Sequence, residues 1–384
     1  MNPIRVLIVD DSVIARRVIT NALLRHEDVS VVGTAANGHL ALAKLPQLAP
    51  DAVILDVEMP EMDGIATLEA LRAAYPTLPV IMFSSLTERG AQVTLDALAA
   101  GANDYVLKPS AQLGETIEQV VSTLLVPKLK AVVREGAAVR RAPPSRAPLF
   151  GGSASPARPE SMRPALASAA ANNKKVRPLS SQSAVPPQIL AIASSTGGPN
   201  ALAEVIPLLP EELGVPVVIV QHMPPIFTRC LAERLDARAR LKVIESEGDE
   251  VLMPGTVYIA PGAHHLEVVR RDGKVLSKLT QEPPENSCRP AADVLFRSVA
   301  RAYGPAALGV VLTGMGHDGL LGARAMVEAG AKVIAQSGPT CVVWGMPRAV
   351  EEAGLCSEIV PLADMGATIE RRVMGALLKN ARSG

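Results

Sequence analysis

The sequence predicts two α/β domains, each a doubly wound parallel sheet, joined by a flexible linker. Apolar strand-like runs alternate with segments of helical period over residues 5–130, and the same alternation resumes at residue 188. The residues in between show no apolar period. A length of 384 residues also exceeds one ordinary core and fits two or three domains.

Residues 5–130 consist of five consecutive strand–helix units, an order that predicts a five-stranded parallel sheet with helices on both faces. The expected strands and helices are, in order, Val6–Val9, Ser12–Arg25, Val31–Ala36, Leu40–Leu48, Ala52–Leu55, Ile65–Tyr75, Val80–Phe83, Glu88–Ala100, Tyr105–Leu107 and Gly114–Leu129.

Residues 131–187 are rich in Ala, Pro, Ser, Arg and Gly. Such a composition buries too little apolar surface to offset the entropy lost on ordering, and it therefore predicts a flexible linker. A coil of about 50 residues has an r.m.s. span of roughly 40 Å, which allows two domains to dock and separate.

Residues 188–384 predict a second, mostly parallel α/β sheet that carries an antiparallel hairpin around Asp272-Gly273. The expected elements are Ile189–Ala193, Ala201–Leu208, Val217–Val220, Phe227–Ala237, Val257–Ala260, the hairpin Leu266–Arg270 and Val275–Leu279, then Ala291–Tyr303, Ala307–Leu312, Leu320–Ala329, Val333–Ala335 and Met365–Leu378.

The composition excludes several classes of function. Lys+Arg and Asp+Glu both number 38, so no net charge attracts nucleic acid or an anionic membrane. No apolar run reaches the roughly 18 residues of a membrane span, and we expect a cytoplasmic protein without membrane insertion. The four cysteines form no C-x-x-C pair, which argues against a zinc site or a disulfide framework.

Charged side chains follow three predicted strands of the first half. Asp10 and Asp11 follow the first strand, Asp56 the third, Ser84 the fourth and Lys108 the fifth. An aspartate after a strand is usually a helix cap or a turn residue, but parallel strands bring all of these groups to one sheet edge. Clustered carboxylates favour Mg²⁺, and a lysine opposite them attracts an anion. The pattern predicts a pocket for a phosphoryl group.

The first 130 residues resemble the receiver domain of two-component response regulators, which has a flavodoxin-like fold. The matching motifs are Val9-Asp10-Asp11-Ser12, Leu55-Asp56-Val57-Glu58-Met59-Pro60, Met62-Asp63-Gly64, Phe83-Ser84-Ser85 and Leu107-Lys108-Pro109. The resemblance implies that Asp56 accepts a phosphoryl group from a histidine kinase. It further implies that Asp10, Asp11, Asp56 and the Glu58 carbonyl hold Mg²⁺, that Lys108 contacts the phosphate, and that Ser84 and Tyr105 form a switch pair.

Three strand ends of the second half carry the groups of a serine hydrolase. The first ends in Ser194-Ser195-Thr196-Gly197-Gly198-Pro199, another in Gln221-His222, and a third leads to His317-Asp318. A Ser, a His and an Asp at one sheet edge supply a nucleophile, a base and an orienting carboxylate. Serines that cap a helix beside a Gly-rich phosphate-binding turn are the alternative. The order Ser, His, Asp and the residue Ala193 exclude the α/β-hydrolase elbow.

The second half resembles the catalytic domain of the CheB family of chemotaxis protein-glutamate methylesterases, which is Rossmann-like. The matching motifs are Ser195-Thr196-Gly197-Gly198-Pro199, Gln221-His222-Met223-Pro224, Tyr258-Ile259-Ala260-Pro261-Gly262, Asp293-Val294-Leu295-Phe296, Leu312-Thr313-Gly314-Met315-Gly316 with Asp318-Gly319, and Val342-Val343-Trp344-Gly345-Met346-Pro347. Ala291 stands where a serine is more usual, and the C-terminus shows no aromatic-rich peptide for receptor tethering.

The resemblance implies a nucleophile at Ser195, with Ser194 as its competitor, a base at His222 and an orienting acid at Asp318. Thr196 would position the histidine and the Met315 N–H would face the oxyanion. The implied substrates are methyl esters of glutamate on the cytoplasmic helices of chemoreceptors, with glutamine deamidation in some members. The catalytic half would need no cofactor.

The resulting organisation is a receiver domain at 1–130, a linker at 131–187 and a catalytic methylesterase domain at 188–384. We expect the unphosphorylated receiver to dock over the Ser195 cleft and phosphorylation of Asp56 to release it. A receptor-binding adaptor without catalysis is the alternative. A DNA-binding regulator disagrees with the neutral charge and the β-α alternation of the second half.

Overall fold

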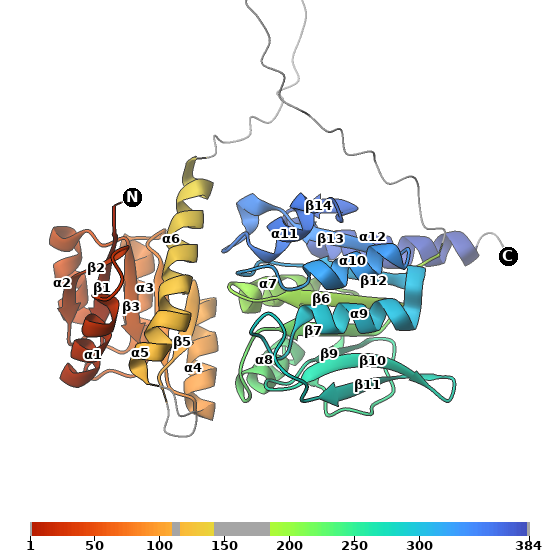
Figure 1. Cartoon of the computed structure of the whole chain (residues 1–384), viewed down its shortest axis with the longest axis horizontal. Coiled ribbons are helices and arrows are strands. Elements are labelled where there is room, and N and C mark those ends of the chain that lie inside the picture. Colours follow the sequence, from red (N-terminus) through yellow and green to blue (C-terminus); the bar gives the residue numbers. More distant parts are fainter. Residues whose placement is uncertain (1, 110–115, 142–184, 382–384) are drawn as a thin grey trace, which may run out of the picture.

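The computed structural model describes residues 2–109, 116–141 and 185–381. The chain forms two α/β lobes that lie side by side, with helices α4 (Glu88–Ala99) and α6 (Val126–Arg141) of the first lobe facing the second (Figure 1). Both predicted fold classes are therefore confirmed.

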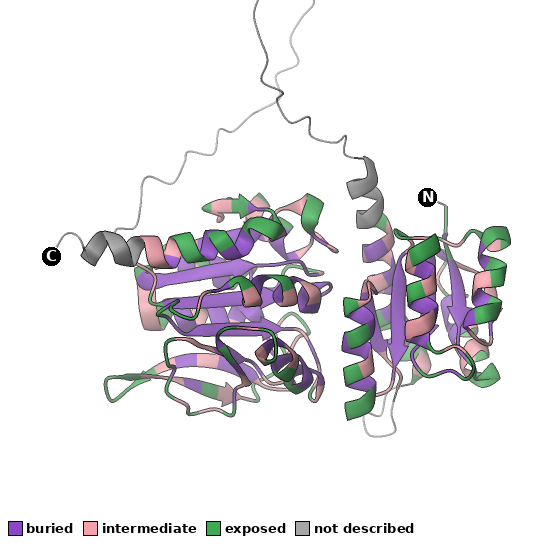
Figure 2. Ribbon diagram, turned by 180° about the vertical axis from the view of Figure 1, so that it is seen from behind, coloured by how far each residue is buried: buried purple, intermediate pink, exposed green. Residues whose placement is uncertain are grey.

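The first lobe is built on a five-stranded parallel sheet of order β2-β1-β3-β4-β5. Its strands are β1 (Ile4–Val9), β2 (Val29–Ala35), β3 (Ala52–Asp56), β4 (Val80–Ser84) and β5 (Asp104–Leu107), and the other helices are α1 (Val13–Leu23), α2 (Gly38–Leu48), α3 (Gly64–Ala74) and α5 (Ile117–Val120). The inner strands are apolar and almost completely buried, as strands covered on both faces must be (Figure 2).

Polar residues set the starts of the helices in this lobe. The Ser12 side chain accepts a hydrogen bond from the Ala15 N–H, and Asp63 accepts one from Ala66. Each bond satisfies a backbone donor that the first helical turn leaves without a partner. Asp63 is therefore a helix cap, whereas the strand-end aspartates have other partners.

The last helix of the first lobe runs further than the sequence predicted. A π-helical turn over Val121–Leu125 continues into α6, which ends at Arg141 rather than near Leu129. Leu125, Leu129 and Val132 recur on one face and are buried against the first lobe, which extends the helix into the predicted linker. Residues 142–184 of that linker lie outside the described part of the chain.

The second lobe contains a seven-stranded parallel sheet of order β14-β13-β12-β6-β7-β9-β8 and a separate antiparallel hairpin. The strands are β6 (Ile189–Ser194), β7 (Val217–Gln221), β8 (Lys242–Glu245), β9 (Thr256–Ile259), β12 (Ala307–Val311), β13 (Lys332–Gln336) and β14 (Glu358–Val360), with β10 (His265–Arg271) and β11 (Lys274–Thr280) in the hairpin. The helices are α7 (Gly198–Val205), α8 (Phe227–Asp236), α9 (Ala292–Tyr303), α10 (Leu320–Glu328), α11 (Met346–Glu352) and α12 (Leu362–Ala381).

The hairpin turns at the predicted place, since Asp272 and Gly273 both have positive φ, at 52° and 75°. Two adjacent residues of this kind match the twist of the paired strands. Strands β8 and β14 and helix α11 were not predicted, because they are short and their apolar residues follow no clear period.

The two lobes share one apolar cluster. Helix α4 of the first lobe packs against α7 and α8 of the second, and the cluster continues from Leu95 and Leu98 across to Leu202 and Phe227. Among the described helices, none is both long enough and apolar enough to span a bilayer.

Candidate phosphoryl pocket and candidate catalytic site

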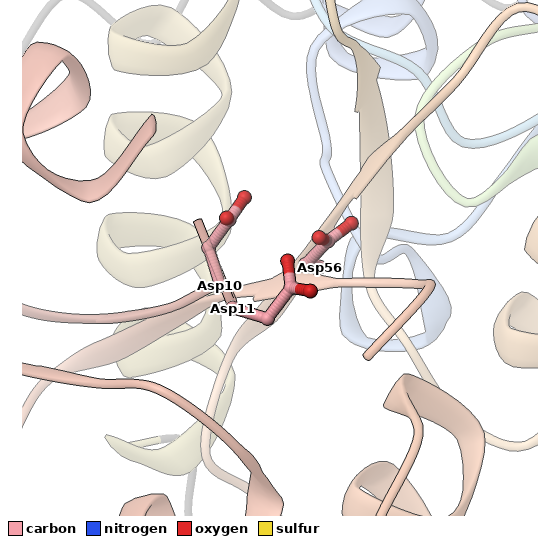
Figure 3. A group of neighbouring side chains, drawn as sticks. All are labelled: Asp10, Asp11 and Asp56. Atoms are coloured by element: carbon pink, nitrogen blue, oxygen red, sulfur yellow. The ribbon is translucent and has the colours of Figure 1, made fainter. Parts of the chain in front are cut away.

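Three carboxylates meet at the carboxyl edge of the first sheet (Figure 3). Asp10 and Asp11 follow β1 and Asp56 ends β3, and one oxygen of each lies within 4.8 Å of the others. Lys108 follows β5, and its Nζ lies 2.7 Å from Asp56 and 3.2 Å from Asp10. The sheet therefore brings the four predicted charged groups together.

The pocket is short of positive charge. Asp10 and Asp56 are almost fully buried, and burial raises the pKa of Asp56 to about 6 although Lys108 opposes the shift. Burial alone would lower the pKa of Lys108, but the two carboxylates outweigh this effect and raise that pKa. The buried Asp10 Oδ2 receives no hydrogen bond within the described residues, and the Lys108 ammonium lies 3.2 Å from it. Three carboxylates that face one lysine leave excess negative charge on hard oxygen donors, which fits Mg²⁺.

The predicted switch residues Ser84 and Tyr105 are both buried. The Ser84 hydroxyl accepts a hydrogen bond from Thr94 at 2.6 Å and contacts the Gly90 carbonyl, so helix α4 holds it. The Tyr105 ring stacks on Phe227 of the second lobe, with centroids 4.9 Å apart and planes 2° from parallel. Ser84 thus contacts α4 and Tyr105 lies at the interface between the lobes, while their role as a switch pair stays a prediction.

Glu58 contributes to the pocket through its backbone. Its side chain is exposed, while its N–H donates to the Asp56 carboxylate and lowers the pKa of that group against the larger effect of burial. The carbonyl of Glu58 as a metal ligand stays a prediction.

At the edge of the second sheet, the two adjacent serines have different environments. Ser194 is fully buried, and its hydroxyl donates to the Gln221 side-chain oxygen at 2.7 Å. Ser195 is half-buried and lies in the turn between β6 and α7. A Cβ at Gly314 would come within 2.9 Å of the Ser195 Cβ, so the neighbouring loop reaches this serine only because residue 314 is glycine. The structure thus favours Ser195 over Ser194 as the accessible hydroxyl.

His222 and Asp318 form a buried pair next to these serines. His222 Nε2 lies 2.7 Å from Asp318 Oδ2, and backbone N–H groups of Ala292, Asp293 and Gly319 also donate to this carboxylate. Burial alone would lower the His222 pKa, but the contacts with Asp318 and Cys288 outweigh it and raise that pKa. His222 in turn lowers the Asp318 pKa against the effect of burial. The Nε2 proton is thereby fixed on the carboxylate side, which leaves Nδ1 as the basic nitrogen.

Two residues that the sequence did not single out also reach this pair. Cys288 Sγ lies 3.6 Å from His222 Nδ1, and the Asn286 amide donates to both Asp318 and Asp293 at 2.9 Å. The chain turns within this segment, where the consecutive residues Asn286 and Ser287 both have positive φ. His265, one of two histidines that are adjacent in the sequence, has other partners. Its ring nitrogens contact the Pro283 carbonyl and the Ala291 N–H.

Thr196 and Met315 lie between the catalytic edge and the first lobe. The buried Thr196 hydroxyl donates to Asp104 of the first lobe at 2.6 Å, and Lys128 of α6 lies 2.9 Å from the same Asp104 oxygen. Met315 packs against a buried cluster that is formed mostly by the first lobe and includes Val343. Hydrogen bonds described for Thr196 include none to His222, and those of His222 include none to Ser195. Ser195, His222 and Asp318 therefore lie in the loops that follow the adjacent strands β6, β7 and β12, and the described contacts join His222 to Asp318.

Two family models match the chain. The model of the CheB methylesterase matches residues 190–369, and that of the response regulator receiver domain matches residues 6–120. The chain is 49% identical over 381 residues to a protein-glutamate methylesterase/protein-glutamine glutaminase of Nocardioides sp., covering 97% of this chain and 96% of that protein. A protein of the same name from Trichodesmium erythraeum is 45% identical, covering 97% of this chain and all of that protein.

Solved structures resemble each half separately. The CheB methylesterase catalytic domain of Thermotoga maritima is 43% identical with a TM-score of 0.48, covering 49% of this chain and 99% of that one. The response regulator domain of the same organism's CheB is 37% identical with a TM-score of 0.32, covering 35% of this chain and 98% of that one.

Proposed function

This chain belongs to the CheB methylesterase family and carries a response regulator receiver domain, and from this membership we propose that it is a phosphorylation-controlled serine esterase acting on glutamate methyl esters of chemoreceptors. The observation that carries the proposal is the largely buried His222–Asp318 pair beside the half-exposed Ser195. A histidine whose one nitrogen is held by a carboxylate presents the other as a base. The adaptor alternative gives no reason for a buried pair of this kind.

The proposed reaction proceeds through an acyl-enzyme. Ser195 Oγ attacks the ester carbonyl carbon while His222 Nδ1 takes its proton, and the Met315 N–H stabilises the oxyanion. Within the described residues that N–H makes no backbone hydrogen bond. Methanol leaves with the proton from His222, and water then releases glutamate by the same steps. The same attack on a glutamine amide releases ammonia, so deamidation is a second possible reaction of the site.

The receiver pocket serves control. Asp56 is the proposed acceptor of a phosphoryl group from a histidine kinase, and Lys108 faces its oxygens. Asp10, Asp11, Asp56 and the Glu58 carbonyl would hold Mg²⁺, which neutralises phosphoryl oxygen charge when bound. Positioning and charge neutralisation are the main requirements of this transfer.

Phosphorylation would release the catalytic edge through the switch pair. A phosphoryl group at Asp56 offers a new acceptor to Ser84, whose present partner Thr94 lies on α4. Movement of Ser84 and of the Tyr105 ring would disturb the Phe227 stack and the Asp104–Thr196 hydrogen bond. Because a tether keeps the lobes at an effective concentration near millimolar, even a modest loss of interface energy changes the docked fraction.

The test is to incubate the full chain with methylated cytoplasmic fragments of chemoreceptors and to follow methanol and ammonia together. We expect methanol release that depends on Ser195 and rises with a small-molecule acyl phosphate and Mg²⁺. Absence of methanol release under phosphorylating conditions, with folded protein, would refute the proposed function.

A further inference from the structure

The Gln221 side chain lies between the strand that carries the proposed nucleophile and the strand that carries the proposed base. It ends β7 directly before His222 and is 2% exposed. Its oxygen accepts the Ser194 hydroxyl at 2.7 Å, and its nitrogen donates to the Ser195 carbonyl at 3.0 Å and the His222 carbonyl at 3.4 Å. One buried amide group therefore contacts both strand ends.

The backbone at the start of α7 lies close to the Gln221 amide. A Cβ at Gly198, the first residue of α7, would lie 2.0 Å from the Gln221 oxygen and 2.9 Å from the Ser194 Cβ. Any side chain at position 198 would push the amide out of the gap. The helix start is thus shaped around Gln221, and the backbone bond from the His222 N–H to the Ser194 carbonyl, 3.1 Å, reinforces the same connection.

We infer that Gln221 is a positioning residue that fixes the distance between the Ser195 nucleophile and the His222 base. The two residues lie on different strands, and a displacement of about 1 Å between reacting groups costs roughly a hundredfold in rate. The inference rests on the proposed esterase function. It also gives Ser194 a role distinct from that of Ser195, because the Ser194 hydroxyl satisfies the amide oxygen that would otherwise be buried without a donor.

The test compares Gln221→Glu with the unchanged full chain in the presence of acyl phosphate and Mg²⁺. The glutamate has nearly the same shape but points an acceptor at the Ser195 carbonyl, so the two oxygens repel. We expect kcat to fall about a hundredfold while KM changes less than about threefold. The rate at which a fluorophosphonate labels Ser195 should fall in parallel, because that reaction needs the same alignment.

Gln221→Asn is a second, milder variant, because the amide remains but is one methylene too short to reach both strand ends. We expect a decrease in kcat of at least about tenfold. Ser298→Ala is the matched control: it removes a buried hydroxyl that connects α9 with the Val268 N–H of β10, away from the site. It should lower the melting temperature without changing kcat or labelling.

Unchanged kcat and labelling in a folded Gln221→Asn or Gln221→Glu variant would overturn the inference, and so would a loss confined to KM. Failure of the unchanged protein to release methanol would instead count against the proposed function. The fluorophosphonate reaction still tests Gln221 in that case, because it depends on the alignment of Ser195 with His222 and not on the ester substrate.

Discussion

Substitution of Asp104 by alanine should activate the unphosphorylated protein. Asp104 is 4% exposed and accepts a hydrogen bond from Thr196 across the interface at 2.6 Å. A buried hydrogen bond to a charged group contributes about 1.5–3 kcal/mol, with little loss to solvent screening at this degree of burial. Because 1.4 kcal/mol is a factor of ten, the docking equilibrium should shift roughly 10- to 150-fold towards the open form.

The assay is methanol release from methylated receptor fragments without a phosphodonor. The basal rate of Asp104→Ala should rise at least about tenfold, up to the rate of the phosphorylated, unchanged chain, and acyl phosphate should then add little. Asp96→Ala is the comparison, because its ion pair with Arg234 joins the same lobes but Asp96 is 58% exposed. A surface pair of this kind is worth about 0–1 kcal/mol, so the basal rate should rise less than about fivefold. An unchanged basal rate in Asp104→Ala, with activation by acyl phosphate preserved, would show that the Asp104–Thr196 hydrogen bond does not hold the lobes together.

Three further predictions concern the two sites. Ser195→Ala should abolish methanol release, whereas Ser194→Ala should reduce kcat by less than about tenfold, since only one buried hydrogen bond is lost; the reverse ranking would identify Ser194 as the nucleophile. Asp318→Asn should lower kcat by about 10⁴-fold. Because activity rises with pH as His222 loses its proton, and Asp318 raises the His222 pKa, the same variant should shift that rise to lower pH; a pH profile that does not move would contradict the pairing. Asp56→Asn, or removal of Mg²⁺ by EDTA, should make the rates with and without acyl phosphate equal, while persistent activation would place the phosphoryl group elsewhere.

Much of the fold follows from local sequence signals. Apolar runs such as Ile189–Ser194 form buried parallel strands, and the polar residues that follow them must emerge at one sheet edge. This is why the positions of Asp10, Asp56, Ser195 and His222 were predictable. The short strand β14 and helix α11 lack a strong period and depend on the sheet that they pack against.

Contacts between distant segments were not predictable in the same way. The Asp104–Thr196 hydrogen bond spans 92 positions and the His222–Cys288 contact spans 66. Neither Asp104 nor Cys288 belongs to a motif with an evident chemical role, and only the folded chain brings them to the catalytic edge. The longer α6 has a similar origin, because the burial of Val132 against the first lobe, on the same helix face as Leu129, becomes evident only in the folded chain.

We propose that a serine esterase site in the second lobe is controlled by phosphorylation of the first. The most direct measurement is the rate of methanol release from methylated receptor fragments, with and without acyl phosphate and Mg²⁺, for the unchanged chain and for Ser195→Ala. We expect a rate that rises on phosphorylation and disappears in Ser195→Ala under both conditions. A rate that does not respond to phosphorylation, or methanol release that survives the loss of the Ser195 hydroxyl, would contradict it.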